Sequence, residues 1–305
     1  MRFPAQVAAF ATLAIICSQI PALGSDDPVR ITTDPGDDNY ATWSPDGRYI
    51  AFESDRTGDK DIWIIPAEGG TARQITRHAR HDMHAAWSPD GSRIAYNSER
   101  SGNYDVWIVP ADGGDPEQVT THDDDDWYPT WSPDGSRIAF CSTRTGNWDV
   151  WTISLESGEE TQVTESPAVD GHPAWSPDGS RIAFISDRSE SLKIWTIPVE
   201  GGTASEVTRG TSADAYPDWA PNGEWIAFTS SRDNTGSAWV VPSSGGPAVR
   251  VTAHDGGHPV WSPDGSRIAF HSREAGNYDI WVVPWTDSPP ANCGEALPAE
   301  SESGR

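Results

Sequence analysis

The chain has 305 residues and a formal net charge of −25 at pH 7. So acidic a surface repels phosphate backbones and anionic membrane surfaces, which argues against nucleic acid as a partner. Disordered chains are often acidic too, but they are poor in aromatic residues. The 16 tryptophans of this chain, most of them regularly spaced, therefore indicate a folded protein.

The first 24 residues have the pattern of a secretory signal peptide. Arg2 precedes an apolar run over residues 7–16, and Ala22-Leu23-Gly24 precede Ser25. The run is short for a membrane span, so we favour a cleaved signal over an uncleaved anchor. We expect a periplasmic or secreted mature protein with no transmembrane segment after signal cleavage. The positions of Cys141 and Cys293 do not suggest a disulfide.

One pentapeptide, Trp-Ser-Pro-Asp-Gly, recurs along the rest of the chain. It begins at Trp43, Trp87, Trp131, Trp175 and Trp261, and it appears as Trp-Ala-Pro-Asn-Gly at Trp219. The successive intervals are 44, 44, 44, 44 and 42 residues. A constant period of this length is typical of repeated supersecondary units.

Each repeat predicts four short antiparallel strands. In residues 84–120, Ser-Pro-Asp-Gly predicts a tight turn between two strands, because proline suits its second position and glycine its fourth. A strand over 93–98, a turn, a strand over 104–109, a Gly-Gly turn and a short strand over 117–120 follow. The 106–109 segment is apolar on both faces, so neighbouring sheets must cover both of its sides.

The strand count predicts a closed ring. The turn motif and the third strand each occur six times, but the fourth strand follows only five of the third strands. Val29–Thr32 resembles the missing copy. We therefore expect an all-β fold, a six-bladed β-propeller of four-stranded antiparallel blades over residues 25–285, closed by the N-terminal strand. Residues 286–305 are rich in Pro, Ser and Glu and are expected to form a disordered tail.

The repeats resemble the TolB-type β-propeller repeat, a WD40-like (PD40) repeat. The matching residues in one copy are Trp131-Ser132-Pro133-Asp134-Gly135, Ile138-Ala139-Phe140 and Asp149-Val150-Trp151, and six copies cover residues 28–284. The resemblance implies a six-bladed propeller. It implies function less directly, since TolB is a periplasmic scaffold of the Tol–Pal system, whereas related propellers cap serine peptidases or form oligogalacturonate lyases. TolB carries an α/β domain before its propeller, for which this chain has no room, so the resemblance does not imply a role in the Tol–Pal system.

Two polar positions recur before each repeat tryptophan. Five residues before it stand Asp38, Asp82, Asp126, Asp170 and Asp214, with Gly256 beside Asp255 in the sixth repeat. Three residues before it, tyrosine and histidine alternate: Tyr40, His84, Tyr128, His172, Tyr216 and His258. A propeller would gather these side chains near the mouth of its central channel, where we predict a binding site.

Two interpretations of this ring remain open. His84, His172 and His258 could bind a divalent metal as neutral imidazoles, with carboxylates beside them. The resemblance to manganese-dependent oligogalacturonate lyases, which have histidines in a comparable central position, agrees with this. Alternatively, the histidines and tyrosines are repeat residues that bond neighbouring loops, and the aspartates cap turns. His271 lies in a second-strand segment and is expected outside the ring.

A second set of charges predicts ion pairs within the blades. Arg56 with Asp61, Arg100 with Asp105, and Arg144 with Asp149 recur at equal spacing. We expect each pair to brace the turn between the second and third strands. The alternative is that these arginines bind a carboxylate ligand.

These observations leave two functional hypotheses. No Gly-x-Ser-x-Gly, His-Glu-x-x-His or phosphate-loop motif is present, and we assign no catalytic residue. The first hypothesis is a monomeric binding scaffold for a cationic ligand, or for an envelope or secreted protein with a basic surface. Its binding face would carry the Asp- and His-rich loops, such as 122–126. The alternative is a metal-dependent lyase acting on an acidic polysaccharide.

Overall fold

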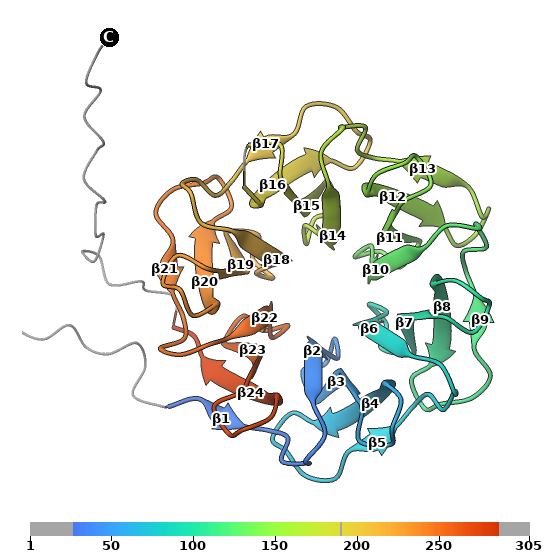
Figure 1. Ribbon diagram of the computed structural model, residues 1–305, viewed down its shortest axis with the longest axis vertical. Helices are drawn as coiled ribbons and strands as arrows, with labels where there is room; N and C mark the ends of the chain where they lie inside the picture. Colours follow the sequence, from blue (N-terminus) through green and yellow to red (C-terminus); the bar gives the residue numbers. More distant parts are fainter. Residues whose placement is uncertain (1–26, 190, 287–305) are drawn as a thin grey trace, which may run out of the picture.

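The computed structural model describes residues 27–189 and 191–286, which form a closed ring of β-sheets (Figure 1). Six four-stranded antiparallel sheets surround a central axis, and the described residues contain no helix. The prediction of a six-bladed all-β propeller is therefore confirmed. The described part of the chain accordingly has no helix that could cross a membrane. The predicted signal peptide and residues 287–305 of the predicted tail lie outside the described residues.

The strands repeat in the same order from blade to blade. The innermost strands are β2 (Asp38–Trp43), β6 (Asp82–Trp87), β10 (Asp126–Trp131), β14 (Asp170–Trp175), β18 (Asp214–Trp219) and β22 (Gly257–Trp261). The second strands are β3 (Tyr49–Ser54), β7 (Arg93–Ser98), β11 (Arg137–Ser142), β15 (Arg181–Ser186), β19 (Trp225–Ser230) and β23 (Arg267–Ser272). The third strands are β4 (Asp61–Pro66), β8 (Asp105–Pro110), β12 (Asp149–Ser154), β16 (Lys193–Pro198), β20 (Ser237–Pro242) and β24 (Asp279–Pro284). The outer strands are β5 (Arg73–Gln74), β9 (Glu117–Gln118), β13 (Glu160–Gln162), β17 (Ser205–Glu206), β21 (Val249–Arg250) and β1 (Val29–Arg30).

The recurring Ser-Pro-Asp-Gly segment forms the turn between the first and second strands. In the second blade the N–H of Gly91 donates to the carbonyl of Ser88 (2.8 Å), and Gly91 has a φ of 71°. The Asp90 carboxylate accepts the Ser88 hydroxyl (2.6 Å) and the N–H of Ser92 (3.0 Å). These bonds lower the pKa of Asp90 to about 2. The motif therefore recurs because it builds the turn.

The hydrophobic core lies between adjacent blades. The cluster that joins the third and fourth blades includes Val150 from one sheet and Trp175, Ile182 and Phe184 from the next. Five further clusters of the same kind complete the ring. The second and third strands are therefore apolar on both faces, as predicted.

The N-terminal strand closes the ring by completing the last sheet. Val29 and Arg30 pair with Val282 and Trp281, so that β1 becomes the outer strand of the sheet β1-β24-β23-β22. The Arg30 guanidinium contacts the buried carboxylate of Asp279 at 2.7 Å. The predicted closure is confirmed.

Candidate binding site in the central channel

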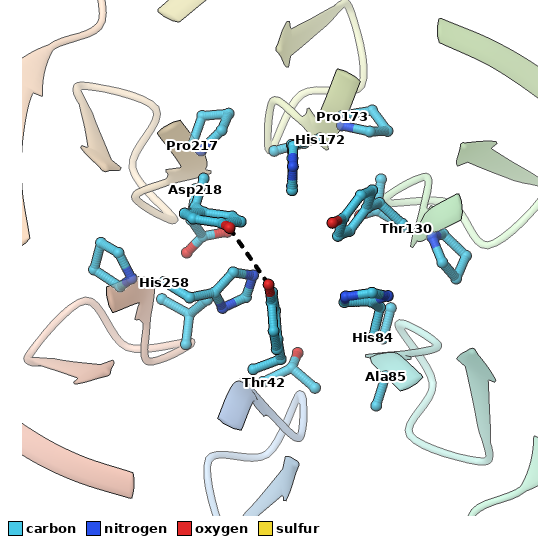
Figure 2. Close-up of a pocket in the computed structure, with 17 residues that line it drawn as sticks. Thr42, His84, Ala85, Thr130, His172, Pro173, Pro217, Asp218 and His258 are labelled. Atoms are coloured by element: carbon cyan, nitrogen blue, oxygen red, sulfur yellow. Dashed lines mark hydrogen bonds between the residues drawn. The ribbon is translucent and has the colours of Figure 1, made fainter. Parts of the chain in front are cut away.

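Six aromatic side chains meet on the axis because each innermost strand has the same irregularity. Every one of these strands shows a register shift against its second strand, as between Asn39 and Thr42 in β2. At each shift one residue has a positive φ: Tyr40 (52°), His84 (55°), Tyr128 (57°), His172 (50°), Tyr216 (57°) and His258 (50°). A bulge of this kind re-aims a side chain. Figure 2 shows His84, His172 and His258 pointing toward the axis from alternate strands.

The preceding blade stabilises most of these bulges. The N–H of His84 donates to Glu53 (3.2 Å), that of Tyr128 to Asn97 (2.9 Å), and that of His258 to Thr229 (2.9 Å). Each acceptor is the fifth residue of a second strand. The N–H of Tyr40 likewise donates to Nδ1 of His271 (3.4 Å). A positive φ at tyrosine or histidine is uncommon and costs free energy, which these bonds between blades offset.

The six rings form a continuous floor across the channel. Neighbouring ring centroids are 4.5 Å apart for Tyr40 and His84, 4.2 Å for His84 and Tyr128, and 3.7 Å for Tyr128 and His172. Around the rest of the ring, the centroids are 4.5 Å apart for His172 and Tyr216, 5.5 Å for Tyr216 and His258, and 4.9 Å for His258 and Tyr40. The hydroxyls of Tyr40 and Tyr216 are 3.4 Å apart. The dashed line in Figure 2 marks a hydrogen bond across this floor.

A cavity of about 110 Å³ lies on one side of this floor. Besides the six rings, it is lined by residues that follow them along the innermost strands: Thr42, Ala85, Ala86, Pro129, Thr130, Pro173, Ala174, Pro217, Asp218, Pro259 and Val260. No residue that precedes a ring position lines it. The cavity is therefore on the side of the Ser-Pro-Asp-Gly turns, which we call the turn end.

Burial keeps the ring uncharged. It lowers the pKa of His84 and of His258 to about 3 and that of His172 well below its usual value. It also raises the pKa values of Tyr40 and Tyr128. The floor therefore consists of neutral imidazoles and neutral phenols at pH 7, able to exchange hydrogen bonds with a ligand.

Asp218 is the exception in this neutral lining. Its carboxylate accepts the N–H of Trp261 at 2.7 Å. Burial raises the pKa of Asp218 to about 7. The hydrogen bond from Trp261 favours the ionised form and so opposes part of this rise. Part of the Asp218 population is therefore ionised at neutral pH.

Comparison with known families agrees with the geometry. The family profile of the TolB beta propeller domain matches residues 129–289, more than half of the chain. The chain belongs to the TolB β-propeller family. The profile of the Tricorn protease N-terminal beta propeller domain also matches residues 60–148.

Solved structures share the propeller of this TolB-type chain. A putative TolB from Agrobacterium tumefaciens is 22% identical with a TM-score of 0.68, and the match covers 83% of this chain and 91% of that one. TolB from Acinetobacter baumannii is 21% identical with a TM-score of 0.66, over 83% of this chain and 65% of that one. An oligogalacturonate lyase from Vibrio parahaemolyticus is 14% identical with a TM-score of 0.60, over 85% and 93%. At these identities the likeness concerns the fold alone.

Curated relatives match this TolB-type chain only over short stretches. An uncharacterized protein of Agrobacterium fabrum is 40% identical over 50 residues, which are 16% of this chain and 17% of that protein. An uncharacterized peptidase of Bacillus subtilis is 57% identical over 35 residues, 11% of this chain and 5% of the peptidase. The chain thus spans a small fraction of the length of either relative.

The five recurring aspartates lie inside the blades of this TolB-type propeller. Their side chains have no exposed surface, and each is ion-paired with the arginine that follows the second strand of its own blade. The pairs are Asp38–Arg56 (2.8 Å), Asp82–Arg100 (2.8 Å), Asp126–Arg144 (2.9 Å), Asp170–Arg188 (2.6 Å) and Asp214–Arg232 (3.0 Å). The geometry therefore does not support the predicted ligand-binding role of these carboxylates.

The predicted pairing of these arginines with third-strand aspartates is wrong. Arg144 reaches Asp126 in the innermost strand because its guanidinium lies over the Trp151 ring (4.8 Å to the centroid), which directs it inward. Asp149, its predicted partner, instead accepts the hydroxyls of Thr145 (2.6 Å) and Thr164 (3.2 Å). Asp61 and Asp105 have equivalent hydroxyl donors.

The structure separates the three histidines by tyrosines. Within residues 27–189 and 191–286, no three His, Cys, Asp or Glu side chains are close enough together to hold a metal ion. The metal at His84, His172 and His258 therefore stays a prediction. Tyr40, Tyr128 and Tyr216 do line the cavity with them. His271 is not one of the six rings, as expected, but it contacts Tyr40 with ring centroids 5.7 Å apart.

Asp218 is the site residue that the sequence analysis missed. A signal was available, because the residue before each repeat tryptophan is Thr42, Ala86, Thr130, Ala174, Asp218 or Val260. Only one of these six residues carries a charge.

Replacing His84 by tyrosine should make folding stability less sensitive to acid. The pKa of His84 is lower in the folded state than the ordinary value of about 6.5, so the unfolded chain binds the proton more tightly. The wild type therefore gains stability from neutral His84 above about pH 6.5 and loses it as the pH falls toward 3, by up to about 1.4 kcal/mol per pH unit. Tyrosine already has this backbone conformation in three blades.

Urea unfolding at about pH 7 and about pH 4.5 measures the effect. The free energy of unfolding should fall less between these pH values in His84→Tyr than in the wild type, by roughly 2 kcal/mol. His254→Tyr, at a side chain that is 68% exposed, is the control. Equal losses in all three proteins would contradict the prediction.

Proposed function

We propose that this TolB-type propeller is a binding scaffold that receives its ligand in the axial cavity at the turn end. The single observation that supports the proposal is the floor of six contacting aromatic rings beneath a cavity whose lining includes one carboxylate. Small-molecule sites are typically concave, with few polar groups that orient the ligand. The ligand is either a free molecule or one side chain of a partner protein.

The setting we propose is the cell envelope or the exterior of the cell. The signal-peptide pattern at residues 1–24 supports export, and the name TolB carried by two structural neighbours agrees with a scaffold. A net charge of −25 favours a cationic ligand or a partner with a basic surface. We propose a monomer, because the outer strand of each described blade is only two or three residues long and offers another chain little backbone to pair with.

The cavity supports a binding function better than a polysaccharide lyase. Its volume of about 110 Å³ is below the about 300–1,000 Å³ of sites for drug-sized ligands. A head group or one side chain fits this volume better than a sugar chain. The oligogalacturonate lyases among the structural neighbours share the fold alone at 14–16% identity.

A defined set of probes and one cavity-filling variant test the proposal. We would measure binding of butylammonium, butyrate, 1-butanol and digalacturonate to the mature protein by ligand-observed NMR. Thr130→Phe fills the cavity, so any probe that binds the wild type should lose binding to this variant. Thr161→Phe is the matched control, because Thr161 is exposed on the outer strand β13.

The outcomes are distinct. If no probe binds, or if binding survives Thr130→Phe, the proposed site is wrong. If neutralising the exposed residues Asp123 and Asp124 abolishes binding instead, the ligand lies at the opposite end of the channel, on the loops that the sequence analysis favoured.

A further inference from the structure

Asp218 occupies a position that the fold does not require to be charged. The residue before the repeat tryptophan is threonine in two blades, alanine in two and valine in one. All six innermost strands nevertheless have the same bulge, and all pair with their second strands in the same way. The carboxylate is therefore an addition to the repeat.

The surroundings of Asp218 leave its charge uncompensated. One oxygen accepts the N–H of Trp261 (2.7 Å). Among the described residues, no lysine, arginine or histidine forms an ion pair with it, in contrast to Asp214 in the same strand, which Arg232 contacts at 3.0 Å. Asp218 is half-buried, and a carboxylate that is partly withdrawn from water is costly unless a cation or several hydrogen bonds compensate it.

The groups that share the cavity with Asp218 suit a cationic donor. They are uncharged, and they include the hydroxyls of Tyr40 and Tyr216, which lie 3.4 Å apart and can accept hydrogen bonds. Figure 2 shows Asp218 beside Pro217 and near His258, facing the same space. A primary ammonium group has three N–H donors and no acceptor, so one carboxylate and two neutral acceptors match it.

We propose that Asp218, together with the tyrosine hydroxyls of the floor, binds a primary ammonium group that enters from the turn end. This inference rests on the proposed function and specifies its ligand class. The ligand is a small aliphatic amine or the side chain of a lysine from a partner protein. The small volume of the cavity admits such a group, and the acidic chain raises the local concentration of cations.

The first experiment compares two probes of equal shape. Butylammonium should bind the wild type, and 1-butanol should bind at least roughly tenfold more weakly, because a hydrogen bond to a charged group is stronger than one to a neutral group. Asp218→Asn should weaken butylammonium about 10- to 100-fold, while its amide oxygen can still accept the N–H of Trp261. Asp264→Asn, the same change at an exposed turn residue of the next blade, is the control and should bind butylammonium like the wild type.

A second variant guards against a folding defect. Asp218→Thr introduces the residue that two other blades have at this position, and it should lose ammonium binding with an unchanged unfolding temperature. If both variants fail to fold, Asp218 is a structural residue and the inference is wrong. It is also wrong if 1-butanol and butylammonium bind equally, or if Asp218→Asn binds butylammonium like the wild type.

The two sources of the ammonium group are separated by a third probe. N-acetyl-lysine methylamide carries the same group on a blocked backbone. If it binds like butylammonium, a lysine of a partner protein is the source, and if only butylammonium binds, a free amine is. A different outcome separates this inference from the proposed function. If no ammonium probe binds, but another probe binds the wild type and not Thr130→Phe, the proposed function stands and this inference is wrong.

Discussion

A chain that begins at Asp34, without the closing strand, is expected to unfold at least about 10 °C below a chain that begins at Asp27. The deletion removes Ile31, which is 6% exposed in the cluster between the last and first blades. Losing a buried side chain of this size costs about 2–5 kcal/mol. It also leaves the Asp279 carboxylate, which has no exposed surface, without Arg30 and Thr32. Water can reach this carboxylate once the strand beside it is gone, so the lost ion pair adds less than the about 3–5 kcal/mol of an unpaired charge that stays buried.

Differential scanning calorimetry of the two chains measures the difference. Val29→Ala is the control within the same strand, since Val29 is 56% exposed and should shift the unfolding temperature little. Equal unfolding temperatures for the chains that begin at Asp27 and Asp34 would show that the closing strand does not hold the ring together.

Arg144→Ala is expected to destabilise the protein by about 3–5 kcal/mol, because it leaves the buried carboxylate of Asp126 without its cation. The Arg144 side chain is only 7% exposed, and its guanidinium also stacks on Trp151 and contacts Glu160. Solvent therefore cannot easily replace it. Urea unfolding at neutral pH gives the change in the free energy of unfolding.

Arg137→Ala in the same blade is the matched control. Arg137 is 43% exposed and faces Glu200, which is 81% exposed, at 3.7 Å. An exposed pair of this kind contributes at most about 1 kcal/mol. Adding Asp126→Asn to Arg144→Ala should recover part of the lost stability, since it removes the buried charge. Similar losses for Arg137→Ala and Arg144→Ala would refute the assigned role of the Asp126–Arg144 pair.

The architecture was predictable because it depends on repeated local signals. Each Ser-Pro-Asp-Gly turn, each apolar third strand and the single displaced copy at Val29–Thr32 follows from residue type and spacing alone. The closure required only a count of strands. The alternation of tyrosine and histidine was also visible, and the structure brings these six residues together around the axis.

The direction of side chains was not predictable to the same degree. Arg144 could reach Asp126 or Asp149, and the choice depends on its stacking on Trp151, a contact across the sheet that spacing does not reveal. The positive φ at Tyr40 and its five equivalents also has no local signal, because glycine or asparagine is the usual residue there. Acceptors from the preceding blade, such as Asn97 for Tyr128, permit it. Asp218 was not predicted as a site residue, because it is charged in one repeat only and the prediction relied on residues that recur in several repeats.

The pairing of β1 with β24 also decides how the protein can be handled. Both described ends of the chain leave from one sheet, and β1 is its outermost strand, at the rim and remote from the axis (Figure 1). A surface tether or a fusion partner joined directly to Asp27 would therefore lie at the rim of the last blade. Protein held in this way keeps its axial opening free and is suited to measurements of ligand capture.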